Sequence, residues 1–244
     1  KEISPYRYVG VNFNSQGNPN LKPSDNYNLD LKWDFNPTPT ELISLTAFYK
    51  LIKNPISRIE VASAGGYLSY ENIADKATVA GVEVEVRKNL FVRPLSSAAN
   101  GMNKLSFGLN GSYIYTNAKM PLATVTTGSQ LEGAAPWIAN FDLSHNFTKG
   151  THSFINTLVF NYVSDKIYTI GTQGYQDIME QGMMTLDFVS QAKLNKYVSL
   201  TLKARNLLNP SYQLSRKANE SGEKVVLSDY KKGINISLGV SCTF

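Results

Sequence analysis

Apolar and polar residues alternate along the last stretch of the chain. From Ile234 to Phe244 every second residue is apolar (Ile, Ile, Leu, Val, Cys, Phe), and the residues between them are Asn, Ser, Gly, Ser and Thr. Successive side chains of a strand point to opposite faces, so this stretch is predicted to be a strand with an apolar face and a small polar face. No stretch has a helical period, and the chain is therefore predicted to be all-β.

The same alternation recurs along the chain and predicts about nine full strands, or about ten with a short one near the start. The earlier repeats cover residues 27–35, 45–49, 82–86, 105–115, 137–147, 158–162, 186–193 and 198–205. In the second repeat, Phe48 and Ile52 stand where polar residues are expected. Each strand is expected to present one apolar face and one polar face.

The connections between these repeats alternate between short and long. Short ones lie at 36–40, 148–150 and 195–196, long ones lie at 60–76, 117–130, 169–180 and 212–224, and the stretch 91–102 departs from the rule. In an up-and-down meander, alternate connections lie on the same edge of the sheet. Short turns on one rim and long loops on the other are typical of outer-membrane barrels, whose strands need about 9–11 residues to cross a bilayer. The apolar positions are therefore predicted to face lipid.

Composition excludes several classes of protein. The chain has 244 residues, and no run approaches the ~20 apolar residues of a membrane helix. A single cysteine, Cys242, excludes an internal disulfide and is expected to be an apolar filler. The net charge is +5, but the basic residues are scattered and no nucleic-acid-binding spacing is present, so no nucleic-acid partner is predicted.

Charged residues of both signs occupy the polar positions of the strands. They are predicted to face the lumen of the barrel and to form cross-strand pairs and contacts with a plug rather than an ion-selectivity ring. These lumen-facing candidates are Asp30, Lys32, Asp34, Glu83, Glu85, Arg87, Asp142, Asp187, Lys203 and Arg205.

Enzymatic chemistry is not predicted. Glu83 and Glu85 lie about 6.6 Å apart on one face, a spacing that could suggest a glycosidase pair, but a wetted lumen wall accounts for them better. Asp142 and His145 fall on opposite faces and form no dyad, and His145 is expected at the membrane interface. With no phosphate loop, cysteine pair or nucleophile elbow, we predict no catalytic residue, no cofactor and no metal.

Aromatic residues in the long connections are the predicted ligand-facing positions, because specificity usually resides on loops held by a rigid scaffold. The candidates are Tyr67, Tyr70, Tyr168, Tyr175 and Tyr212.

Several short motifs resemble those of TonB-dependent outer-membrane receptors. Residues 17–24, Gly-Asn-Pro-Asn-Leu-Lys-Pro-Ser, are similar to the family's Asn-Pro-x-Leu-Lys-Pro-Glu segment, with Ser24 in place of Glu. Residues 70–73 followed by 80–85 resemble its strand entry, and residues 206–209, Asn-Leu-Leu-Asn, resemble an element near its end. The last strand, ending on Phe244, is similar to the signal that the barrel assembly machinery reads.

The resemblance implies a barrel of about 22 strands with a plugged lumen, which needs more than twice this length. Nine strands are also an odd number, which cannot close as an antiparallel ring. Residues 1–244 are therefore expected to be the carboxy-terminal portion of the barrel domain, with the plug domain not present in this chain.

The function implied is TonB-energised uptake of a scarce nutrient (siderophore, vitamin, peptide or glycan) by a multi-pass protein of the Gram-negative outer membrane. The implied partners are outer-membrane lipid and lipopolysaccharide, the TonB complex through the missing plug region, and possible association with a surface lipoprotein. Alternatives are a passive porin, a small stand-alone barrel, a membrane-barrel hydrolase and a soluble β-sandwich adhesin.

Overall fold

A computed structural model describes residues 2–5, 7–10, 13–61, 66–95, 101–120, 130–218 and 222–243. Its regular structure is β throughout, and none of these residues belongs to a helix long and apolar enough to cross a membrane. The strands are β1 (Arg7–Tyr8), β2 (Asn14–Gln16), β3 (Asp25–Phe35), β4 (Leu42–Lys53), β5 (Ile56–Val61), β6 (Tyr67–Asn72), β7 (Lys76–Leu95), β8 (Gly101–Ala118), β9 (Trp137–Lys149), β10 (His152–Val163), β11 (Lys166–Thr169), β12 (Ile178–Glu180), β13 (Met183–Lys193), β14 (Val198–Arg205), β15 (Ser211–Lys217), β16 (Lys224–Lys231) and β17 (Asn235–Cys242).

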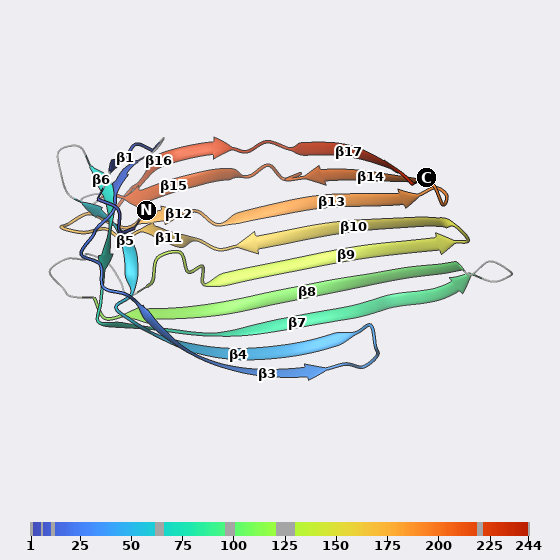
Figure 1. Ribbon diagram of the computed structural model, residues 1–244, viewed down its shortest axis with the longest axis horizontal. Helices are drawn as coiled ribbons and strands as arrows, with labels where there is room; N and C mark the ends of the chain where they lie inside the picture. The colour runs from blue at the N-terminus through green and yellow to red at the C-terminus, as the bar shows by residue number, and fades with distance from the viewer. Residues whose placement is uncertain are drawn as a thin grey trace.

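Nine long strands form one antiparallel sheet in the order β17-β14-β13-β10-β9-β8-β7-β4-β3 (Figure 1). Strands that follow one another along the chain are neighbours, apart from the short strands inserted between some of them. The predicted meander is confirmed, and each predicted full strand corresponds to one strand of this sheet. The sheet is open, with β3 and β17 at its edges.

The two ends of the long sheet differ as predicted. At one end, here called the turn end, short connections join β3 to β4, β9 to β10 and β13 to β14. The connection 96–100 between β7 and β8 lies outside the described residues. The described parts of the long connections lie at the other end, the loop end (Figure 1). The stretches 60–76 and 212–224 were expected to be loops, but they include β6 and most of β15.

Two smaller sheets form the loop end. In one of them, each short strand is next along the chain to a long strand: β11 follows β10, β12 precedes β13, β15 follows β14 and β16 precedes β17. The order β11-β12-β15-β16 is therefore the same as the order β10-β13-β14-β17 in the long sheet. The other sheet, β1-β2-β6-β5, runs across the direction of the long strands (Figure 1). An isolated parallel bridge between Ile59 of β5 and Ile170, the residue after β11, joins the two smaller sheets. The loop end is thus a folded β layer.

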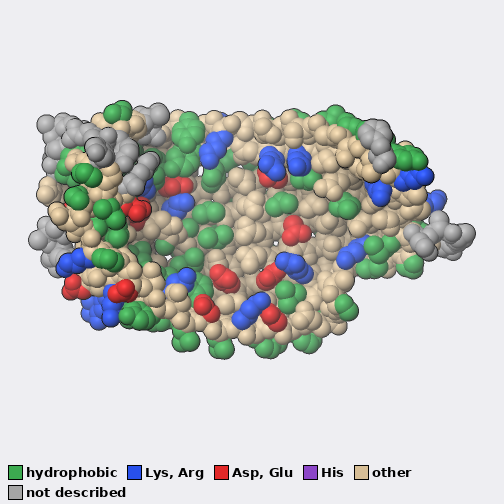
Figure 2. All heavy atoms as spheres, in the orientation of Figure 1, with side chains coloured by type: hydrophobic (Ala, Val, Ile, Leu, Met, Phe, Trp, Pro, Cys, Tyr) green, Lys and Arg blue, Asp and Glu red, His purple; other side chains and the backbone are tan. Residues whose placement is uncertain are grey.

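The apolar face of the long sheet is uncovered. The strand register places Leu31, Ala47, Val82, Tyr113 and Trp137 in one row across five strands. Leu31 is 75% exposed and Trp137 is 56% exposed. A continuous exposed apolar surface of this kind marks contact with a membrane or a partner. In Figure 2 hydrophobic side chains project along the lower edge, where β3 lies, and charged side chains are spread over the middle of the sheet.

The buried core of the described residues lies at the loop end. Ile59, Leu131 and Ile170 cluster with Ala77 and Ala118. Ala77 is on the same face of β7 as Glu83, because the two are an even number of residues apart in a strand that is regular between them. The loop-end segments therefore fold over the polar face, and none of the described residues forms a second layer on the apolar face.

Phe48 interrupts the polar positions of β4 because it covers a glycine. It lies directly opposite Gly81, and its ring occupies the space that a Cβ of Gly81 would take, close also to the carbonyl oxygen of Tyr113. A large ring over a glycine fills the gap that the missing side chain leaves and helps to fix the register.

Substituting Gly81 by alanine is expected to destabilise the folded state by about 1–3 kcal/mol, because the new methyl group overpacks against the Phe48 ring and a backbone oxygen. Gly111→Ala is the matched control, since its Cβ would meet only the Ile138 carbonyl oxygen, at 4.0 Å. Urea titration of the folded protein measures both variants. Equal midpoints for the two would contradict the packing argument.

Asparagine side chains fasten the motifs at 17–24 and 70–73 to the boundary between the long sheet and the loop end. Asn72 accepts a hydrogen bond from the Lys22 N–H (2.8 Å) and donates to the carbonyl oxygens of Lys22 (3.0 Å) and Asn54 (2.8 Å). Asn18 donates to the carbonyl oxygen of Tyr70 (3.0 Å). Asn54 has a φ of 47°, a conformation that asparagine tolerates better than most residues. The two motifs thus hold the segment after β2 against the end of β6 and the junction of β4 and β5.

The Asn-Leu-Leu-Asn motif has the same role between β14 and β15. The Asn206 N–H donates to Asp187 Oδ1 (2.8 Å), and its side chain donates to the Gly233 carbonyl oxygen (2.7 Å). The Gly233 N–H donates in turn to Asn209 Oδ1 (3.0 Å). Both asparagines have positive φ, 59° and 44°. The motif ties three strands at the point where the long sheet ends.

Candidate binding site at the loop end

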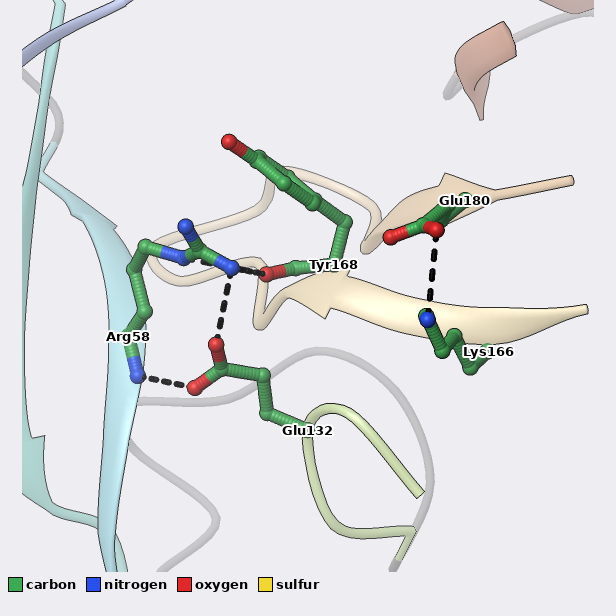
Figure 3. Close-up of polar contacts among 5 residues, drawn as sticks. All are labelled: Arg58, Glu132, Lys166, Tyr168 and Glu180. Atoms are coloured by element: carbon green, nitrogen blue, oxygen red, sulfur yellow. Dashed lines mark hydrogen bonds and ion pairs between the residues drawn. The ribbon is translucent and has the colours of Figure 1, made fainter. Parts of the chain in front are cut away.

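Arg58 is the centre of a polar network between distant parts of the chain (Figure 3). Its Nη2 donates to Glu132 Oε1 (2.9 Å) and to the carbonyl oxygen of Tyr168 (2.6 Å), while its backbone N–H donates to Glu132 Oε2. The guanidinium also lies over the Tyr168 ring, 3.9 Å from its centroid. Because Glu132 and Tyr168 are 74 and 110 residues away along the chain, these contacts fasten β5 to two other loop-end segments.

A second ion pair fastens β5 to β15. Arg216 Nη2 lies 2.7 Å from Glu60 Oε2, and both side chains are about 85% buried (15% and 14% exposed). The Thr172 hydroxyl donates to the carbonyl oxygen of Glu60 (2.5 Å). The Arg216 guanidinium lies 5.5 Å from the ring centroid of Tyr175. Arg58 and Glu60, two residues apart on one short strand, thus carry both attachments.

The third polar group of the loop end surrounds Glu180. Lys166 Nζ lies 3.2 Å from Glu180 Oε1, across the directly paired positions of β11 and β12 (Figure 3). Burial, the charge of Glu180 and the neighbouring phenols of Tyr168 and Tyr230 together raise the pKa of Tyr212 to about 12. Burial also raises the pKa of the Glu132 carboxyl, against the opposing effect of Arg58.

In the Glu180→Gln variant, we expect the pKa of Tyr212 to fall part of the way from about 12 toward its ordinary value of 10.0, since burial remains and the carboxylate charge is lost. The raised pKa favours the neutral phenol in the folded state, so its stabilising contribution is complete below pH 10.0 and is lost as the pH rises through about 12. Ultraviolet titration, with Tyr212→Phe subtracted, measures the shift. A Tyr212 that already titrates near its ordinary value would contradict the geometry.

Four of the five predicted tyrosines lie around these networks. Tyr168 and Tyr175 each have an arginine over the ring, Tyr70 interacts electrostatically with Arg58 and Tyr168, and Tyr212 lies beside Glu180. Tyr67 lies at the other end of β6, paired with Val61. The structure thus brings together residues that the sequence analysis placed in three separate loops.

The charged residues predicted for the lumen all share the polar face of the long sheet. The register aligns Asp34 with Glu85 through Ser44, and Lys32 with Glu83 through Thr46. The recorded ion pairs on this face join residues two apart on one strand, Lys32–Asp34 (3.1 Å) and Glu85–Arg87 (2.7 Å). The prediction of cross-strand pairs is wrong for these four, because their neighbours across the sheet are uncharged.

Sequence reasoning missed the charged residues of the loop-end site. Arg58 and Glu60 alternate with Ile59 and Val61, a short period-two pattern that could have predicted β5. Their partners could not be found in this way, because each is supplied by a different loop. Phe244, the predicted assembly signal, lies outside the described residues.

Among the described residues, no three His, Cys, Asp or Glu side chains are grouped so that they could hold a metal ion. His145, which was expected at the membrane interface, lies on the apolar face, where its Nε2 is 2.8 Å from Asn103 Oδ1. Cys242 is a free, exposed thiol, on the apolar face as predicted.

The long sheet is an antiparallel meander that has an exposed apolar face, a charged opposite face and short turns at one end. These features together define the wall of a transmembrane β-barrel. The family model described as "TonB dependent receptor-like, beta-barrel" matches residues 2–207. The chain therefore belongs to the TonB-dependent receptor β-barrel family.

No curated protein and no solved structure matches the chain. The family is one of outer-membrane receptors and transporters that work with TonB, and it is not a family of enzymes. Membership places the general activity in TonB-dependent transport at the Gram-negative outer membrane.

Proposed function

We propose that this chain forms part of a receptor that captures a scarce nutrient at its loop end and imports it with energy from TonB. The observation that carries the proposal is the folded loop end itself, in which three polar networks hold aromatic and charged side chains over one end of the polar face. Preorganised polar and aromatic groups on a rigid scaffold suit ligand capture. The cargo would be a siderophore, vitamin, peptide or glycan.

The polar face would form the lumen wall around a plug supplied by a part of the polypeptide outside residues 1–244. Asp142, Asp187, Lys203 and Arg205 share that face with the paired charges of β3 and β7. Charged groups on a closed lumen wall would meet plug side chains, and movement of the plug would open a path for the cargo. The apolar face would contact outer-membrane lipid and lipopolysaccharide, and a surface lipoprotein would bind at the loop end.

Transport by the full-length receptor in cells with and without TonB tests the proposal. We expect uptake of the cargo to be abolished when TonB is deleted, while binding of the cargo to the cell surface is retained. Uptake that continues unchanged without TonB would contradict the proposal and favour a passive porin.

A further inference from the structure

Two basic side chains lie on the apolar face at the turn end, where β7, β8, β9 and β10 run side by side (Figure 1). Arg93 of β7 is directly paired with Asn103 of β8, and Asn103 is paired with Phe147 of β9. Phe147 lies two residues from His145 on one side and two from Lys149 on the other. Directly paired residues share a face of the sheet, as do residues two apart on a strand. Arg93, Asn103 and Lys149 therefore all lie on the apolar face, and we call them the turn-end basic surface.

The side chains of this surface remain available as donors. Arg93 and Lys149 are exposed, and neither has an ion-pair partner among the described residues. Asn103 Oδ1 lies 2.8 Å from His145 Nε2, which leaves the side-chain nitrogen of Asn103 as a donor. Strand spacings of about 4.8 Å between strands and about 3.4 Å per residue put the Cα atoms of Arg93 and Lys149 about 12 Å apart, with Asn103 on the strand between them. A ligand held by a guanidinium, an ammonium and an amide nitrogen has to supply acceptors.

The charge at this end of the four strands is positive without compensation. The sequence contains no Asp or Glu at 91–105 or at 145–154, which include the turn ends of β7, β8, β9 and β10. Glu41, in the turn before β4, already accepts a backbone N–H of β7 (3.1 Å). The loop end differs, because there Asp25 stands directly opposite Lys53 on the apolar face. The turn-end basic surface therefore favours an anionic acceptor.

Aromatic rings lie next to the basic surface, on the side toward the middle of the sheet. The Arg93 guanidinium is 5.5 Å from the ring centroid of Phe91, two residues nearer the middle of β7. Phe147, two residues before Lys149, has its ring centroid 6.4 Å from that of Phe154 on β10. Long basic side chains at a membrane surface place their charge at the headgroups and their aliphatic part along apolar surface. Cations above apolar rings match the phosphate and the acyl chains of a phospholipid.

We propose that the turn-end basic surface binds the phosphodiester of one anionic phospholipid, with the acyl chains of that lipid against the neighbouring phenylalanines. The short turns of outer-membrane barrels face the periplasm, so this lipid belongs to the periplasmic leaflet. A zwitterionic headgroup is disfavoured, because its ammonium group would approach Arg93 and Lys149 with no carboxylate nearby. The inference rests on the proposed contact between the apolar face and lipid, and it depends neither on the cargo nor on TonB.

Native mass spectrometry of the full-length receptor in detergent tests the proposal, with phosphatidylglycerol and phosphatidylethanolamine of the same acyl chains as probes. We expect one phosphatidylglycerol to bind at least about tenfold more tightly than phosphatidylethanolamine. Arg93→Gln/Lys149→Gln should weaken phosphatidylglycerol binding by about tenfold or more, because each basic side chain near an anionic lipid contributes to binding. Arg93→Lys/Lys149→Arg keeps both charges and should bind within about threefold of the parent. Soluble glycerophosphoglycerol should not displace the lipid at equal concentration, because it has no acyl chains.

Lys104→Gln/Lys193→Gln is the matched control, because it removes two charges at the same end of the sheet from the opposite, polar face. It should bind phosphatidylglycerol within about twofold of the parent. Equal affinity for the two lipids, equal weakening in the two glutamine double variants, or displacement by the soluble headgroup would overturn the proposal. Dependence of transport on TonB is measured separately, so failure of lipid binding at this surface would leave the proposed function intact.

Discussion

Replacing Val84 by arginine is expected to destabilise the barrel by about 2–4 kcal/mol, the range for a cationic side chain on the lipid face at the bilayer midplane. Val84 lies near the middle of β7, between Leu45 of β4 and Gly111 of β8, and is 41% exposed on the apolar face. Neither of these directly paired residues has a carboxylate that could pair with the new charge. Urea titration of the full-length receptor in phospholipid vesicles measures the loss.

Glu83→Arg is the matched control, because Glu83 is the next residue on the same strand and points to the opposite, polar face. The same arginine there should change the free energy of unfolding by less than about 1 kcal/mol, as expected for a wetted surface. If the two variants unfold at the same urea concentration, the apolar face does not contact lipid in the folded receptor.

Removing the Arg58 side chain is expected to detach β5 from its neighbours. In Arg58→Met, Glu132 would remain about four-fifths buried without its guanidinium partner, and the Tyr168 carbonyl oxygen would lose its donor. Breaking a buried pair by removing one partner costs about 3 kcal/mol or more. Because the change is confined to the loop end, we expect faster hydrogen exchange in β5 and β11 and little change in β9 and β10.

The loss in Arg58→Met should be larger at pH 8 than at pH 5. The pKa of Glu132 is already raised by burial, and without Arg58 it rises further. A raised pKa means that the folded state favours the protonated carboxyl, so stability is greatest below the ordinary pKa of 4.5 and falls as the pH rises through the folded value. Exchange rates, corrected for their intrinsic dependence on pH, give the opening free energy of β5 in the variant and in the parent. A difference between the two that is the same at pH 5 and pH 8 would contradict this account of the Arg58 network.

Arg87→Met is the control, because it also removes an arginine from an ion pair, but from a pair that is exposed to solvent. Arg87 pairs with Glu85 at 2.7 Å, but its side chain is 67% exposed. An exposed pair contributes about 0–1 kcal/mol, so this variant should leave both the unfolding midpoint and the exchange of β5 unchanged.

The long sheet could be predicted from the sequence because each of its strands is specified by residues that are neighbours along the chain. Apolar residues at every second position specify a strand and its apolar face, as in β17, where Ile236, Leu238 and Val240 all lie on one face and are exposed. The alternation of short and long connections then specifies the meander. The exception at Phe48 has a different cause, the glycine directly opposite it on the neighbouring strand β7.

The loop end could not be predicted in the same way, because its contacts join segments far apart in the sequence. The partner of Arg58 lies 74 residues away, and no pattern within β5 identifies it. The motifs carried more structural information than their resemblance alone suggested. Asn72, Asn206 and Asn209 use their side-chain amides to replace backbone hydrogen bonds where long strands end.

Spin-label accessibility along β7 tests the central claim, that the apolar face of the sheet contacts lipid while the polar face lines an enclosed interior. Single cysteines at residues 82–86 of the full-length receptor, with Cys242 replaced by serine, would be labelled in vesicles and exposed to oxygen or to a water-soluble nickel chelate. We expect oxygen to broaden the signals at Val82, Val84 and Val86, and those at Glu83 and Glu85 to be largely insensitive to it. Equal sensitivity at both sets, or greater access of the nickel chelate to the valines, would contradict the claim.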